Sequence, residues 1–212
     1  DQAMRTIYAP ARSEIEIKRS RFIASLARTD SEQAAREFIA QIRREFPDAR
    51  HHCTAFIIHQ DIGPDTTRSS DDGEPAGTAG GPMLNVLTES GLTNLACVVT
   101  RYFGGTKLGT GGLVRAYSGA VQQVLKHAQT ARIITQPSYR LHLPIGEAGK
   151  IEAKLTENGY QILARDFAQD ATLRFSAPLE TTQSQIESYL SSISGREISV
   201  EMAPDITREV RE

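Results

Sequence analysis

The chain of 212 residues contains no tryptophan, only two cysteines and few aromatic residues, which make up 6% of the total. The cysteines, Cys53 and Cys97, lie in separate apolar segments, and the sequence has no paired-cysteine spacing that would hold zinc. We therefore expect two buried free thiols, which fits a cytoplasmic location.

Long apolar segments and a dominant charge are also missing. The longest apolar runs are far too short to span a bilayer, and the first residues lack the apolar core of a signal peptide. The net charge is −2, with +2 on residues 1–135 and −4 on residues 136–212. Because neither part is strongly basic, any contact with nucleic acid must be a local patch. The sequence leaves open whether residues 1–3 belong to the natural chain.

The segment from Thr93 to Ala128 joins a buried strand to a helix through a glycine-rich turn. Apolar residues without polar alternation predict a strand over Leu95–Val99, and helical spacing predicts a helix over Leu113–Ala128. Such a turn exposes backbone N–H groups at the positive end of the helix dipole, where anions bind. Its five glycines and three basic neighbours are Gly104, Gly105, Gly109, Gly111, Gly112, Arg101, Lys107 and Arg115.

Two standard nucleotide motifs fail at this turn. Lys107 follows Thr106 and precedes Leu108, which breaks the Walker pattern, and the dinucleotide pattern meets Val114 at its third glycine. Two interpretations stay open. The glycines either let the helix pack closely on the strand or create a contact for an anion or a nucleic acid.

Two adjacent histidines begin the predicted strand His51–His59. Because neighbouring residues of a strand point to opposite faces, His51 and His52 are not expected to share a metal ion. We expect one imidazole to pack or to form a hydrogen bond, while the other can face a cleft as an acid–base group.

Residues 61–82 form a long polar stretch without apolar periodicity, which predicts a functional or mobile loop. Asp71, Asp72 and Glu74 place three carboxylates within four residues of it. These groups are expected to bind a divalent cation, to pair with the basic residues of the glycine-rich turn, or to form a solvated acidic turn.

The remaining pattern predicts an α+β protein of two domains, 1–135 and 136–212. The first is expected to contain a hairpin turning at Arg19–Ser20, a helix over Asp30–Phe46 with a capping box from Asp30 and Gln33, and a short helix over Met83–Ser90. Thr130–Ser138 is expected to be a polar connection. The second domain has the order β-α-β-β-α-β of ferredoxin-like domains. Its strands are expected at 139–144, 160–166, 171–177 and 197–202, and its helices at 147–158 and 179–193.

Two blocks are distinctive, SSDDGEPAGTAGGPM from Ser69 and VVTRYFGGTKLGTGGLVRAY from Val98. With KRSRFIA near Arg19 and DARHHCTAF from Asp48, they resemble the signature of the YigZ/IMPACT family in its bacterial two-domain form, over nearly the whole chain. The resemblance implies that residues 1–135 form an IMPACT N-terminal-type domain with the fold of the second domain of ribosomal protein S five. It implies that residues 136–212 resemble domain five of elongation factor G. Eukaryotic members regulate translation during amino-acid starvation, and bacterial members are suspected of contacting nucleic acid or the ribosome.

Three functions are therefore considered. The first is a non-enzymatic, translation-linked regulatory protein that contacts RNA, the ribosome or a translation factor through a basic glycine-rich cleft. The second is an enzyme, a metal-assisted hydrolase or a phosphoryl-transfer enzyme, that acts on a small phosphorylated substrate. The third is a protein-interaction adaptor that uses the acidic second domain.

No cofactor, resident metal or membrane contact is predicted, and the sequence does not indicate an oligomeric state. A base is expected to stack on Tyr102 or Phe103 if either is exposed. The residues expected to bind a nucleic acid or another anion are Arg21, Arg101, Tyr102, Gly104, Gly105, Lys107, Gly109, Gly111, Gly112 and Arg115. The polar residues expected in the same cleft are His51, His52, Asp71, Asp72 and Glu74.

Overall fold

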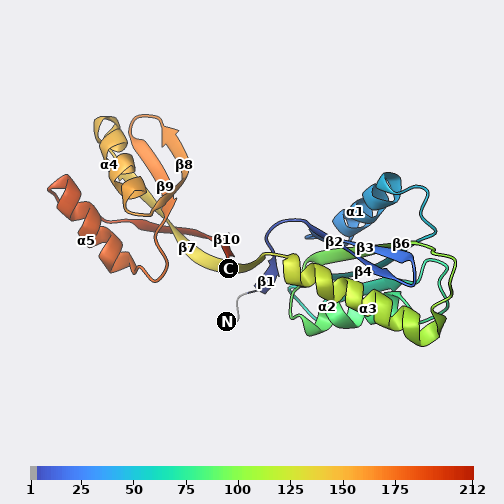
Figure 1. The fold of residues 1–212 in the computed structure, drawn as a ribbon. Helices are drawn as coiled ribbons and strands as arrows, with labels where there is room; N and C mark the ends of the chain where they lie inside the picture. The colour runs from blue at the N-terminus through green and yellow to red at the C-terminus, as the bar shows by residue number, and fades with distance from the viewer. Residues whose placement is uncertain (1–3) are drawn as a thin grey trace. The chain divides into compact units, whose positions relative to one another are not determined.

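The computed structural model describes residues 4–212 and divides into two compact units (Figure 1). One unit contains the chain up to Ile133 together with Glu209–Glu212, and the other contains Ile134–Arg208. The described residues form two sheets and five helices, so the predicted mixture of helices and strands in two parts is confirmed. The fold names given to the two domains and their exact division at residue 135 stay predictions.

The first unit is built on an antiparallel sheet with the strand order β2-β3-β6-β4-β5. A two-residue turn joins β2 to β3, and Lys18 and Arg19 adopt the positive φ angles, 48° and 69°, that such a hairpin turn requires. This confirms the hairpin expected at Arg19–Ser20. The strands are β2 (Ala11–Ile17), β3 (Ser20–Arg28), β4 (His51–Ile58), β5 (Thr66–Ser70) and β6 (Leu95–Tyr102).

Helices cover both faces of this sheet, with α1 (Glu32–Glu45) on one face and α2 (Gly80–Glu89) and α3 (Gly109–His127) on the other (Figure 1). The alternation of side chains along β4 separates two apolar cores. Cys53 and Ala55 belong to the core under α2 and α3, whereas Phe56 packs with α1. Because the central strands are buried on both faces, their sequences show no polar alternation.

All three helices of the first unit start at other residues than expected, and α2 begins at Gly80 rather than at Met83. α1 begins after Ser31 rather than Asp30, because the Ser31 hydroxyl accepts the N–H of Ala34 at 3.0 Å while the Asp30 carboxylate accepts from Arg28 at 3.0 Å. α3 begins at Gly109, four residues before the expected Leu113. Gly111 and Gly112 therefore lie in the first turn of the helix.

Two segments expected to lack regular structure are strands. β5 lies within the predicted loop 61–82, and its exposed Thr, Ser and Arg side chains give no apolar alternation because it is an edge strand. The expected connection Thr130–Ser138 is the beginning of β7 (Thr130–Leu143), which pairs with β1 (Met4–Ile7).

The second unit has the predicted order β-α-β-β-α-β, and its strands pair in the order β10-β7-β9-β8. The last strand begins at Glu201 rather than at the expected residue 197, and Ile198 and Val200 pack into the core from the segment before it. The helix expected from residue 179 begins at Gln183, after a capping box of Thr182 and Gln185. The elements after β7 are α4 (Ile145–Glu157), β8 (Gln161–Phe167), β9 (Ala171–Ser176), α5 (Gln183–Ser194) and β10 (Glu201–Arg211). None of the helices within residues 4–212 is both long and apolar enough to cross a membrane.

Both cysteines are buried and free, as expected, and desolvation raises the pKa of each thiol to about 12. Only the thiolate is nucleophilic, so both thiols are expected to resist an aromatic disulfide reagent at about pH 8 in the native protein. Both should react within minutes once guanidinium unfolds the chain. Rapid release of one equivalent of chromophore from the native protein would contradict this burial.

Candidate functional site

A cavity of about 590 Å³ lies beside the glycine-rich turn of the first unit. Its lining contains five of the residues predicted for the site: His51, Glu74, Arg101, Lys107 and Gly109. The other lining residues are Arg50, Pro75, Phe103, Leu108, Thr110 and Leu113. The cavity therefore combines cations, the start of a helix and apolar side chains.

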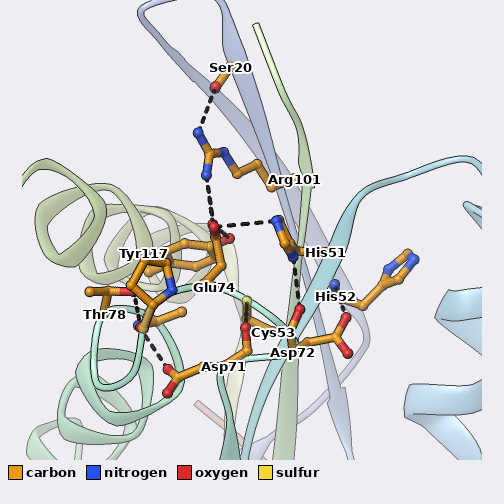
Figure 2. Close-up of polar contacts among 12 residues, drawn as sticks. Ser20, His51, His52, Cys53, Asp71, Asp72, Glu74, Thr78, Arg101 and Tyr117 are labelled. Atoms are coloured by element: carbon orange, nitrogen blue, oxygen red, sulfur yellow. Dashed lines mark hydrogen bonds and ion pairs between the residues drawn. The ribbon is translucent and has the colours of Figure 1, made fainter. Parts of the chain in front are cut away.

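An ion pair is buried in the cavity wall, where Arg101 is 5% exposed and Glu74 is 8% exposed. Nη1 of Arg101 donates to both Glu74 carboxylate oxygens at 3.0 and 2.8 Å, and Nη2 donates to the Ser20 hydroxyl at 3.3 Å (Figure 2). The Tyr117 hydroxyl donates to Glu74 Oε2 at 2.5 Å. Desolvation, followed by the nearby Cys53 and Glu74, raises the pKa of Tyr117, so its hydroxyl keeps its proton. The charge of Arg101 is therefore compensated inside the protein rather than offered to a ligand.

His51 joins this pair from β4. Its Nδ1 lies 2.8 Å from the carbonyl oxygen of Asp72, and because a carbonyl only accepts, Nδ1 carries a proton. Its Nε2 lies 3.4 Å from Glu74 Oε1, so His51 and Arg101 both approach the same carboxylate.

Asp71 holds the start of α2. Its carboxylate accepts the backbone N–H groups of three residues, at 2.9, 3.1 and 2.8 Å, from Gly77, Ala79 and Gly80 respectively. Desolvation opposes ionisation of Asp71, but these hydrogen bonds prevail and lower its pKa below the ordinary value of 3.8. The Asp71 carboxylate therefore caps the N-terminus of α2, although Asp71 lies several residues before the helix.

Asp72 faces the other side of the loop. Its carboxylate accepts from Arg43 at 2.9 Å and from the backbone N–H of His52 at 2.7 Å. Burial opposes ionisation, but these two contacts lower the pKa of Asp72. Desolvation and the Arg43 charge lower the pKa of His52, whose imidazole packs beside Thr100. Thus one imidazole lines the cavity and the other is buried, as strand alternation predicts.

The three carboxylates consequently have separate partners and do not converge. Within residues 4–212, no group of three histidine, cysteine or carboxylate side chains is arranged to hold a metal ion. Glu74 pairs with Arg101 beside the glycine-rich turn, as the second expectation for this loop states, whereas Asp72 pairs with Arg43 of α1, which lies outside that turn.

Two glycines of the turn have separate structural roles, and the close approach at Gly104 is to the β2–β3 hairpin rather than between helix and strand as expected. A Cβ atom on Gly104 would lie 2.1 Å from the carbonyl carbon of Arg19, so this glycine permits close packing against the β2–β3 hairpin. Gly109 adopts φ +75° and opens α3, whose N-terminus has no side-chain cap. Backbone N–H groups of that first turn therefore remain available to an anion.

Several predicted residues lie outside the cavity lining. Arg21 is exposed and donates to Glu14 at 2.8 Å, and the Tyr102 hydroxyl donates to Asp48 at 2.8 Å. Arg115 folds back on its own helix, near Gly111. The predicted residues absent from the lining are Arg21, His52, Asp71, Asp72, Tyr102, Gly104, Gly105, Gly111, Gly112 and Arg115.

The expected binding and cleft residues do not include Ser20, Tyr117 or Arg50, which belong to the site. Ser20 is buried and accepts from both Arg101 and the N–H of Gly104, at 3.3 and 3.2 Å. Arg50 donates its backbone N–H to the carbonyl of Arg101, because β4 and β6 are antiparallel neighbours. Only the pairing register of these strands could have revealed Arg50.

The fold and the cavity define a two-unit α+β protein with a buried Glu–Arg pair beside an uncapped helix start. Residues 18–125 match the model of the Impact N-terminal domain. The IMPACT family member YigZ of Escherichia coli (strain K12) is 44% identical over 170 residues, 80% of this chain and 83% of that protein. The chain belongs to the IMPACT family.

Two solved structures were compared with the chain. A crystal structure of a hypothetical protein aligns with a TM-score of 0.63 and 38% identity, and covers 94% of this chain and 97% of that one. A structure of the two-domain translational regulator Yih1 aligns with 27% identity over 60% of this chain and 48% of that one. Its TM-score of 0.36 is too low to support an argument about this chain.

Replacing Glu74 tests the buried pair. Glu74→Gln removes the negative charge and leaves Arg101 buried without its counter-ion, so the free energy of unfolding should fall by about 3 kcal/mol. The matched control is Glu14→Gln, which breaks the exposed pair with Arg21 and should cost less than about 1 kcal/mol. Urea unfolding at neutral pH measures both, and equal losses would contradict the assigned role of Glu74.

Asp71→Ala tests the cap of α2 and should lower the free energy of unfolding by about 1–2 kcal/mol at neutral pH. Because the pKa of Asp71 is lower in the folded protein, its contribution is complete above the unfolded value and disappears as pH falls through the folded value. The difference from the parent protein should therefore shrink below about pH 4. Asp61→Ala, at a fully exposed side chain in the loop before β5, is the control, and a pH-independent loss for Asp71→Ala would refute the ionic cap.

Proposed function

We propose that this protein is a non-enzymatic, translation-linked regulatory protein that contacts RNA through the cavity beside the glycine-rich turn. Membership of the IMPACT family supports the link to translation, since the resemblance implies this role for eukaryotic members. The observation that carries the RNA contact is an exposed aromatic ring among free cations. Phe103 is 44% exposed, and the Arg50 guanidinium carbon lies 5.5 Å from its ring centroid.

The groups proposed to bind phosphate are the cations and backbone N–H groups that do not contact the buried Glu74–Arg101 pair. Arg50 and Lys107 have exposed side chains and form no ion pair with a carboxylate within residues 4–212. The uncapped first turn of α3 lies beside them in the lining. Guanidinium, ammonium and backbone N–H groups are the usual partners of phosphate oxygens in RNA.

The apolar part of the cavity suits a base. Phe103, Leu108 and Leu113 line it together with Pro75, and the unpaired bases of single-stranded RNA stack on aromatic side chains. A base on Phe103 would be next to the cations that take its phosphate. This arrangement favours single-stranded RNA, whose bases are accessible, over a duplex.

A small phosphorylated substrate is the second candidate, favoured by the placement of His51 beside Glu74 at the cavity wall. Proton transfer between an imidazole and a carboxylate is common in catalysis. An enzyme of this kind should bind a mononucleotide as tightly as an oligonucleotide. An RNA-binding protein should bind the longer ligand more tightly, because it adds phosphate contacts.

Fluorescence anisotropy with a labelled oligouridylate tests the proposal at low and physiological salt. The affinity should fall steeply as salt rises, and Phe103→Ala should weaken binding by roughly 5- to 100-fold through the loss of stacking. Lys107→Glu should weaken binding. It should also reduce the slope of log affinity against log salt concentration by about one. Lys126→Glu, at the far end of the same helix, is the matched control and should bind like the parent protein.

Absence of binding at low salt by folded protein would refute the RNA contact. So would an affinity that Phe103→Ala and Lys107→Glu leave unchanged. Equal binding of uridine monophosphate and the oligonucleotide would instead favour the enzyme. Co-sedimentation with purified ribosomes, lost in the same two variants, would connect the cavity to translation.

A further inference from the structure

A second groove lies on the opposite face of the first unit's sheet, between α1 and the edge strand β5, and has a volume of about 450 Å³. We call it the α1–β5 groove. α1 supplies one wall, β5 the other, and Thr54 and Phe56 of β4 form the floor. Its remaining residues are Arg36, Ile39, Ala40, Arg43, Arg68, Ser69 and Ser70.

We infer that the α1–β5 groove binds an extended acidic peptide, which adds as a strand to the free edge of β5. This site is separate from the RNA cavity, and the inference does not depend on the proposed function. Three observations support the inference: the free edge of β5, the positive charge of the groove and the absence of an exposed aromatic ring from its lining.

The edge of β5 offers main-chain groups to a partner. β5 is the last strand of its sheet and pairs only with β4 in the described chain. The carbonyl of Thr67 accepts from the side chain of its own neighbour Arg68, at 2.8 Å, which places this carbonyl on the side away from β4. In an antiparallel strand alternate residues share that direction, so Ser69 presents its N–H and C=O to the same free edge. Unpaired groups of this kind are a template for another strand.

The register of β5 on β4 places charge beside this edge. Arg68 pairs with Phe56 and Ser70 pairs with Thr54, so both side chains of β5 share the α1 face with the groove floor. Every second side chain of an added strand would point into the same face. The partner's acidic side chains would therefore meet the arginines, and the intervening side chains would not.

The arginines of the groove carry more positive charge than the neighbouring carboxylates neutralise. Arg36 donates to Glu32 at 2.8 Å, and the nearest carboxylate oxygen to Arg68 belongs to the same Glu32, at 4.0 Å. Two arginines thus share one carboxylate, while Arg43 pairs with Asp72. The side chains of Arg36, Arg43 and Arg68 are 63%, 45% and 58% exposed, so a partner can reach all three. Arginine forms planar, two-point contacts with carboxylates, which suits aspartate or glutamate.

The groove lacks the feature that marks the RNA cavity. The aromatic residue in its lining, Phe56, is only 2% exposed, and the Arg36 guanidinium carbon lies 5.8 Å from the ring centroid. A base consequently has no exposed ring on which to stack. The charge and the free edge together fit an acidic peptide better than single-stranded RNA.

A labelled peptide of about eight residues that alternates glutamate and valine is the probe, measured by fluorescence anisotropy on the full chain. We expect it to bind, and the matching lysine–valine peptide not to bind. Arg36→Glu combined with Arg68→Glu should weaken binding by at least about tenfold. The matched control is Arg44→Glu, an exposed arginine of α1 that does not line the groove, and it should change affinity less than about twofold.

N-methylation of the peptide tests strand addition directly. Only alternate amides of an added strand face β5, so methylating one alternate set should abolish binding and methylating the other should not. No binding of the acidic peptide to folded parent protein, or equal binding by the Arg36/Arg68 variant, would overturn the inference. Equal effects of the two methylated sets would also overturn it. So would oligouridylate binding that the Arg36/Arg68 variant loses and Phe103→Ala keeps, since it would assign the groove to nucleic acid.

Discussion

The buried pair of Glu74 and Arg101 fixes the site of the first unit. Removing both charges from water is costly, and contacts with neighbouring groups offset part of that cost. Ser20 in the hairpin accepts from Arg101 and Tyr117 in α3 donates to Glu74, while His51 in β4 lies 3.4 Å from Glu74. One ion pair therefore connects the loop before α2 with three strands and a helix. The shape of the cavity wall follows from that network.

The same pair divides the basic residues into two classes. Arg101 has its charge compensated, and the phenyl rings of Phe22 and Phe103 lie 5.5 and 5.6 Å from its guanidinium carbon, so it acts as part of the wall. Lys107 and Arg50 keep their charge at the surface of the cavity. In the proposed function, recognition of the anion depends on residues that flank Arg101, the most distinctive arginine of the sequence, rather than on Arg101 itself.

Sequence patterns predicted the elements whose burial gives a periodic signal, such as α1, β4 and the β2–β3 hairpin. They failed for β5, whose exposed side chains carry no periodicity, and for the end of the chain, where a packed segment precedes β10. At the candidate site, the composition of the turn pointed to the region where the cavity lies. Which charges cancel there was not predictable, because the pairing of Arg101 with Glu74 spans 27 positions and depends on tertiary contacts.

The assignment of Glu209–Glu212 to the first unit has a consequence for how the protein can be dissected. The second unit is an insertion, since the polypeptide leaves the first unit after Ile133 and returns to it at Glu209. A stop codon after the first unit would delete the returning segment, including the ion pair between Arg28 and Glu209 and the backbone bond from Glu212 to Thr130. An autonomous first unit is better made by joining residues 133 and 209 through a short glycine-rich linker than by truncation.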